Sequence, residues 1–104
     1  MSDTTMNDAI NPNHYTKECS LECIDVMRAT FGLRAVIDFC LCNAFKYMWR
    51  YKNKNGVEDL NKASWYLSYI EKASEAVPTQ CMGSAYRLRE LLNDLMVRNE
   101  LEAE

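Results

Sequence analysis

The chain has 104 residues, of which 48% are hydrophobic and 26% charged, a composition typical of one soluble globular domain and not of a disordered chain. Its formal net charge of −3 argues against general nucleic-acid binding, which depends on many phosphate contacts, so any anion site must be local. Three glycines and two prolines are few for an all-β fold, which needs many turns. We therefore expect an all-α protein.

Two helices are predicted in the first half of the chain. Ser20 is a favourable N-cap for a helix that runs to about Phe31, and Gly32 can end it. A second helix is predicted from Leu33 to about Tyr51. Its apolar side, with residues three and four apart, consists of Val36 or Ile37, Cys40, Ala44, Met48 and Tyr51.

Two more helices are predicted in the second half. Asn53 to Gly56 form a break, and a third helix runs from Val57 to about Ala76, closed by Pro78. Its apolar residues are Leu60, Ala63, Leu67 and Ile70. A last helix is predicted over about Ser84 to Leu101. Its leucines are Leu88, Leu91, Leu92, Leu95 and Leu101.

This pattern divides the chain into a flexible arm over residues 1–13, a core domain over 14–76 and a C-terminal helix over 77–104. We expect a compact bundle of three to four helices. Helices this rich in Trp, Tyr, Met and Leu leave an apolar patch uncovered, so we expect a homo-oligomer. The C-terminal helix is the predicted oligomerisation or partner-binding element.

The environment of the protein is indicated by its cysteines and its N-terminus. Five cysteines, an odd number, together with a polar N-terminus that lacks an apolar segment, indicate a reducing compartment. We expect the protein in the cytoplasm, with no membrane-spanning segment. The cysteines lack the spacing of common zinc sites and have no neighbouring histidine in the sequence, so we expect buried thiols without a catalytic role.

The end of the second helix carries the most informative segment. Residues three and four apart share a helical face. The face in question presents Asn43, Lys46, Tyr47 and Arg50, and Lys52 and Lys54 extend its positive charge. Such a stripe suits a ligand with phosphate groups and a ring, because arginine grips two phosphate oxygens and lysine acts as a point charge. A solvated amphipathic helix end has the same pattern, and both interpretations stay open.

The third helix adds a further cation and further aromatic rings. Lys62 lies about one turn into this helix and is predicted to face the same cleft as the stripe. Tyr47, Trp49, Trp65 or Tyr66 can stack on a base. Packing between two antiparallel helices is the alternative for these rings, and the more frequent role of such residues.

Four ordered blocks of the sequence resemble a known family. The blocks are Asn11 to Tyr15, Glu22 to Val26, Asn43 to Lys54 and Gly56 to Leu67, within residues 11–71. They are similar to the bacteriophage SaV-like family, domain of unknown function 3310, which includes a podophage nucleotide kinase. That kinase phosphorylates deoxynucleoside monophosphates and lacks any standard nucleotide-binding motif. The resemblance implies a phage protein with a nucleotide ligand and a nucleoside-monophosphate-kinase-like activity.

A kinase built on this chain would have no P-loop, because no glycine begins a Gly-x-x-x-x-Gly-Lys pattern. We predict Lys46, Arg50 and His14 as its catalytic residues, although a structural hydrogen bond explains His14 equally well. The predicted nucleotide-binding residues are Asn43, Tyr47, Lys52, Lys54, Lys62, Trp65 and Tyr66.

Mg²⁺ is the expected cofactor. Its predicted ligands are Glu22, Asp25, Glu58 and Asp59, preferably through water. Glu58 and Asp59 also suit the first turn of a helix, where acidic side chains interact favourably with the helix dipole. Asp59 and Lys62 are spaced to form an ion pair as well.

Three alternative functions belong to other classes. A phage protein with this site would bind a nucleotide or cyclic dinucleotide without turning it over, and so counter a host defence signal. Acidic pairs on adjacent helices would instead make a Mg²⁺-dependent nucleotide pyrophosphohydrolase. An inhibitor that binds a host protein, through the last helix, is the remaining alternative.

Overall fold

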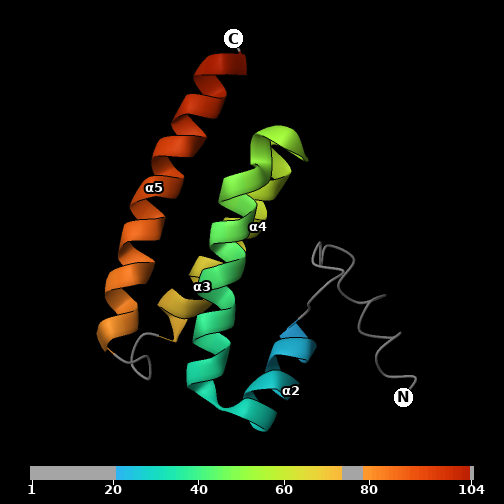
Figure 1. The fold of residues 1–104 in the computed structure, drawn as a ribbon, viewed down its shortest axis with the longest axis vertical. Coiled ribbons are helices and arrows are strands. Elements are labelled where there is room, and N and C mark those ends of the chain that lie inside the picture. The colour runs from blue at the N-terminus through green and yellow to red at the C-terminus, as the bar shows by residue number, and fades with distance from the viewer. Residues whose placement is uncertain (1–20, 74–78, 104) are drawn as a thin grey trace, which may run out of the picture.

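The structure, a computed structural model, describes residues 21–73 and 79–103. These residues form α2 (Leu21–Phe31), α3 (Leu33–Arg50), the short 3-10 helix η1 (Tyr51–Asn53), α4 (Val57–Lys72) and α5 (Thr79–Ala103). In Figure 1, α4 runs antiparallel to α3, α5 lies beside them, and α2 packs near the beginning of α3. The prediction of an all-α bundle is confirmed. No helix in the described part of the chain is long and apolar enough to span a bilayer.

A single residue, Gly32, separates α2 from α3. Its φ of +95° lies in the region that side chains with a Cβ rarely adopt, and its N–H donates a hydrogen bond to the carbonyl of Arg28 at 2.8 Å. The prediction that Gly32 ends the first helix is confirmed. Because the turn is so short, α2 packs directly on α3 and places the buried side chain of Ile24 in the core.

The reversal between α3 and α4 lies at the predicted break. α3 ends at Arg50, and Tyr51 continues the chain as the first residue of η1. The N–H of Gly56, which has a φ of +60°, donates to the carbonyl of Tyr51 at 2.7 Å and closes the turn. This local geometry makes α3 and α4 antiparallel neighbours along most of their length.

The core forms where α3 and α4 face each other. The residues predicted for the two apolar sides are all buried: Val36, Ile37, Cys40, Ala44, Met48 and Tyr51 on α3, and Leu60, Ala63, Leu67 and Ile70 on α4. Tyr47 and Tyr66 are buried as well, in agreement with the alternative that these rings pack between the two antiparallel helices. Their rings stack with centroids 6.1 Å apart and an interplanar angle of 12°. This pair makes the centre of the helix hairpin aromatic rather than purely aliphatic.

Helix α5 is longer than predicted. It begins at Thr79, before the predicted start at Ser84, and it includes Gly83 although glycine is a poor helix former. Ala85 and Leu92 are buried against α3 and α4, whereas Leu91 and Leu101 are exposed. The leucine pattern therefore marks the inner face of α5 only in part. Helix α4 ends at Lys72, and residues 74–78 lie outside the described ranges, as does the predicted arm over residues 1–13.

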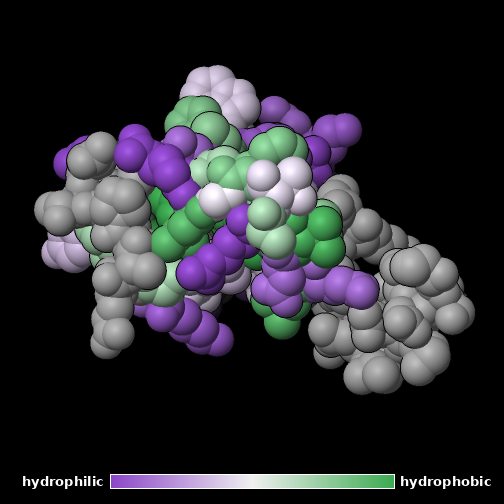
Figure 2. Space-filling view, turned by 90° about the horizontal axis from the view of Figure 1, so that it is seen from below, coloured by the Kyte–Doolittle hydropathy of each residue, from purple (hydrophilic) through white to green (hydrophobic). Residues whose placement is uncertain are grey.

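Several large apolar side chains are exposed on the described part of the chain. They are Leu21, Val26 and Phe31 on α2, Phe45 and Trp49 on α3, Val57 on α4, and Tyr86, Leu91, Val97 and Leu101 on α5. Figure 2, viewed from the end where α2 meets α3, shows hydrophobic surface between hydrophilic residues. These exposed side chains are available for contacts between subunits, and the homo-oligomer stays a prediction.

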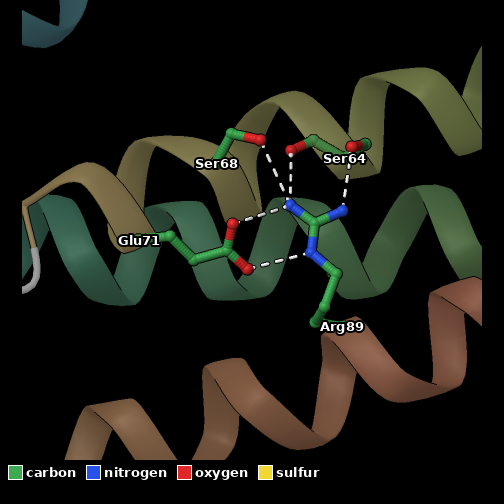
Figure 3. A network of polar contacts seen from close by, with 4 residues as sticks. All are labelled: Ser64, Ser68, Glu71 and Arg89. Carbon is green, nitrogen blue, oxygen red and sulfur yellow. Dashed lines mark hydrogen bonds and ion pairs between the residues drawn. The ribbon is translucent and has the colours of Figure 1, made fainter.

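A guanidinium group joins α5 to α4 (Figure 3). Arg89 donates from Nε and Nη2 to the two carboxylate oxygens of Glu71, at 2.9 and 3.0 Å. It also donates to the hydroxyls of Ser64 and Ser68, at 2.9 and 3.1 Å, and to the carbonyl of Ser64 at 3.5 Å. Because one planar group meets several acceptors on α4, it fixes the position of α5 along that helix.

Replacing Arg89 by Ala should lower the free energy of unfolding by about 1–2 kcal/mol, because these partly solvated contacts are lost. Thermal melts followed by circular dichroism measure this change. Arg87→Ala is the matched control, since Arg87 is an exposed arginine on the same helix. Equal melting temperatures for the two variants would show that the contacts of Arg89 do not hold α5 in place.

Candidate functional site

Three cationic groups converge on the ring of Tyr47. Lys46 Nζ lies 4.5 Å, Arg50 Cζ 4.8 Å and Lys62 Nζ 5.3 Å from the ring centroid. Lys46 and Arg50 come from the last turns of α3, and Lys62 from the first half of α4. The electron-rich face of an aromatic ring attracts such cations. We refer to Lys46, Arg50 and Lys62 as the cation cluster.

The aromatic residues beneath the cation cluster belong to the core. Tyr47 and Tyr66 are both fully buried and stack on each other. Phe39 and Trp65 make T-shaped contacts with Tyr66, at centroid distances of 5.8 and 5.0 Å. The predicted stacking of a base on Tyr47 or Tyr66 does not fit this placement, because neither ring is exposed. The structure places these rings in the core, where Tyr47 contacts the three cations.

Buried Asp59 is the anionic partner of the cation cluster. Its carboxylate accepts hydrogen bonds from Arg50 Nε at 3.4 Å, from the backbone N–H of Asn55 at 3.2 Å and from Asn55 Nδ2 at 3.4 Å. Burial by itself raises the pKa of Asp59, but these hydrogen bonds and the charge of Arg50 outweigh it, so the pKa lies below its ordinary value. Asp59 is therefore an ionised residue that faces Arg50 rather than Lys62.

The contact with Asp59 orients the guanidinium group of Arg50. Only Nε is engaged with the carboxylate, and the side chain is 30% exposed. Within the described residues the two terminal nitrogens have no hydrogen-bond acceptor. Arg50 therefore keeps the part of its fork that binds two oxygens of a phosphate or carboxylate.

The four carboxylates predicted to hold Mg²⁺ are not brought together. Glu22 and Asp25 lie on α2, and Glu58 and Asp59 lie in the first turn of α4. Among the described residues there is no group of three or more acidic, histidine or cysteine side chains that would hold a metal ion. Asp59 is also engaged by Arg50 and Asn55, and the Mg²⁺ cofactor stays a prediction.

Of the remaining predicted site residues, Lys52 and Asn43 make other contacts, Lys54 is exposed, and His14 is not described. Lys52 forms an exposed ion pair with Glu102 of α5 at 3.5 Å, and Lys54 is exposed in the turn before α4. The amide of Asn43 donates to the carbonyl of Phe39 within its own helix at 2.9 Å. His14 lies outside the described residues.

The cysteines were expected to be buried, and among the described cysteines this is confirmed only for Cys40. Cys40 is in the core, and burial raises the pKa of its thiol to about 12, so it is not a nucleophile at neutral pH. Cys23 and Cys42 are exposed, contrary to the expectation. The structure gives no described thiol a role beside the cation cluster.

These features define an all-α protein with a local cationic site on the hairpin of α3 and α4. The chain belongs to the family described as "Protein of unknown function (DUF3310)", whose family model matches residues 10–68. The resemblance seen in the sequence is thereby confirmed at the level of the family. Lys46, Arg50, Asp59 and Lys62 all lie inside the matched segment, whereas α5 lies outside it.

A curated relative comes from a bacteriophage. The chain is 31% identical over 70 residues to the Gene 1.7 protein of Enterobacteria phage T3, which supports a phage origin. The alignment covers 64% of this chain and 43% of that protein, so the chain spans less than half the length of this relative. No solved structure matches the chain significantly.

Replacing Asp59 by Asn should lower the free energy of unfolding by about 2 kcal/mol at pH 7, because Arg50 and Asn55 lose an ionised acceptor. The pKa of Asp59 is lowered in the folded state, so its contribution is present above the ordinary aspartate pKa of about 4 and is lost as the pH falls below it. Urea unfolding at pH 7, 5 and 3 should show the gap between wild type and variant closing.

The control for this prediction is Glu58→Gln, since Glu58 is the neighbouring acid in the same helical turn and is exposed. We expect this variant to change stability little at any of the three pH values. A gap between wild type and Asp59→Asn that stays constant down to pH 3 would contradict the role given to the Asp59 carboxylate.

Proposed function

We propose that this phage protein binds the phosphates of a nucleotide at the cation cluster and transfers a phosphoryl group from a nucleoside triphosphate to a deoxynucleoside monophosphate. The observation that carries the proposal is the convergence of three cations, from two helices, on one buried ring in a chain of net charge −3. The resemblance to a phage family that includes a nucleotide kinase supports the choice of reaction.

The charge balance of the cluster favours a phosphate. Three cations stand against one described carboxylate, that of Asp59. Neither Lys46 nor Lys62 has a carboxylate among the described residues within ion-pair distance. Positive charges held close together repel one another, and a phosphate monoester with a charge of about −1.5 to −2 at pH 7 relieves that repulsion.

The chemistry asks little more of the protein than charge and position. An oxygen of the acceptor phosphate attacks the γ-phosphorus of the donor, the bond from that phosphorus to its bridging oxygen breaks, and a nucleoside diphosphate leaves. The acceptor phosphate loses its last proton near pH 6, so at neutral pH it needs no general base. Arg50 would hold two phosphate oxygens, and Lys46 and Lys62 would neutralise charge that develops in transfer.

The proposal predicts turnover that depends on the two lysines. Incubated with ATP, Mg²⁺ and each common deoxynucleoside monophosphate, the protein should form a deoxynucleoside diphosphate and an equal amount of ADP, quantified by ion-exchange chromatography. Lys46→Gln and Lys62→Gln should each reduce kcat/KM by about tenfold or more, because each removes a charge from the transition state. Lys72→Gln is the matched control, an exposed lysine at the end of α4.

Arg50 needs a separate comparison because it also stabilises the fold. Arg50→Ala should weaken nucleotide binding more than tenfold, but it leaves Asp59 buried without its cation and so lowers stability too. Arg50→Lys retains the charge without the planar fork. Unchanged nucleotides across the whole panel, with binding intact, would overturn the kinase and favour sequestration of the nucleotide.

A further inference from the structure

The aromatic rings that are open to a ligand lie on the outer side of α3. Trp49 is 78% exposed and Phe45 is 51% exposed. Their rings stack on each other, with centroids 6.0 Å apart and an interplanar angle of 29°. Large aromatic side chains are usually covered in folded proteins because their apolar surface is costly to expose to water. A preformed, exposed stack of two rings is therefore a surface that a flat partner can cover.

This aromatic pair borders the cation cluster on the same helix. Trp49 follows Lys46 by three residues and directly precedes Arg50. Side chains three apart on a helix are neighbours, with Cβ atoms about 5–6 Å from each other. Flat apolar rings thus lie next to a concentrated positive charge. A nucleotide is complementary to this arrangement, because its flat base can stack on the rings and its anionic phosphate can pair with the cations.

We propose that Phe45 and Trp49 form the platform on which the base of the nucleotide stacks while its phosphate lies at the cation cluster. This assignment rests on the proposed function and adds the residues that hold the base. It replaces Tyr47 and Tyr66, which are buried, by the exposed rings of the same hairpin. Stacking uses a face that every base has, so the platform predicts weak preference among the four bases.

The area of the pair argues for a small ligand rather than a second copy of the chain. Two aromatic side chains bury at most about 150–250 Å² each. A stable protein interface covers about 800 Å² on each partner. Phe45 and Trp49 are thus too small a surface to hold two subunits together by themselves, whereas a nucleobase covers one ring of this size fully.

The test separates the base from the phosphate. Titration calorimetry would compare each common deoxynucleoside monophosphate with deoxyribose 5-phosphate, which carries the phosphate and sugar without a base. Wild type should bind the nucleotides about tenfold more tightly or better. Trp49→Ala should remove this preference and leave the affinity for deoxyribose 5-phosphate unchanged, whereas Trp49→Phe should restore part of the preference.

Tyr86→Ala is the matched control, because Tyr86 is an exposed aromatic residue on α5 and its loss should not change the preference. Circular dichroism melts should give the same stability for Trp49→Ala as for wild type, since an exposed ring contributes little to the core. Trp49 emission should also be quenched by the nucleotides and not by deoxyribose 5-phosphate, measured in a Trp65→Phe background.

The outcomes distinguish the two proposals. A Trp49→Ala protein that keeps its preference for nucleotides, while Lys46→Gln and Lys62→Gln lose phosphate binding, would overturn the platform and leave the phosphate site standing. The platform would also be overturned if the only effect of Trp49→Ala were a change in oligomeric state, measured by analytical ultracentrifugation. Deoxyribose 5-phosphate that binds wild type and both lysine variants equally would overturn the phosphate site itself.

Discussion

The ion pair between Arg50 and buried Asp59 joins the end of α3 to the beginning of α4, and the rest of the site depends on this contact. Asp59 lies in the first turn of α4 and Arg50 at the end of α3, so their contact sets the register between the helices. With that register, Lys62 reaches the ring of Tyr47 from the opposite helix. A buried carboxylate without its partner is strongly destabilising, which makes this arrangement hard to change.

The site and the hydrophobic core share one aromatic group. Tyr47 contacts the cations and also stacks on Tyr66 in the centre of the hairpin. Tyr47 is held by core packing and loses little further freedom when a ligand binds, so the ring that the cations contact is preorganised. The same sharing couples stability to binding, and it explains why lysine substitutions, which leave Asp59 paired, separate the two effects better than changes at Arg50.

Helix α5 contributes to the bundle from outside the segment that the family model matches. It closes the core with Ala85 and Leu92 and is fixed along α4 by the contacts of Arg89. The cation cluster is built by α3 and α4 alone, so the element that completes the fold is distinct from the elements that form the site. Changes in α5 should therefore act on stability before they act on binding.

The sequence by itself determined the helical class, the break at Asn53 to Gly56 and the apolar sides of α3 and α4, because these follow from local spacing and from glycine. The tertiary structure decided which flank of α3 is covered. Tyr47 and Trp49 were both candidates for base stacking, and α4 covers Tyr47, which shares the apolar side of α3 with Ala44 and Tyr51, while Trp49 stays exposed on the opposite side. It likewise paired Asp59 with Arg50, which required the antiparallel register rather than proximity along the chain.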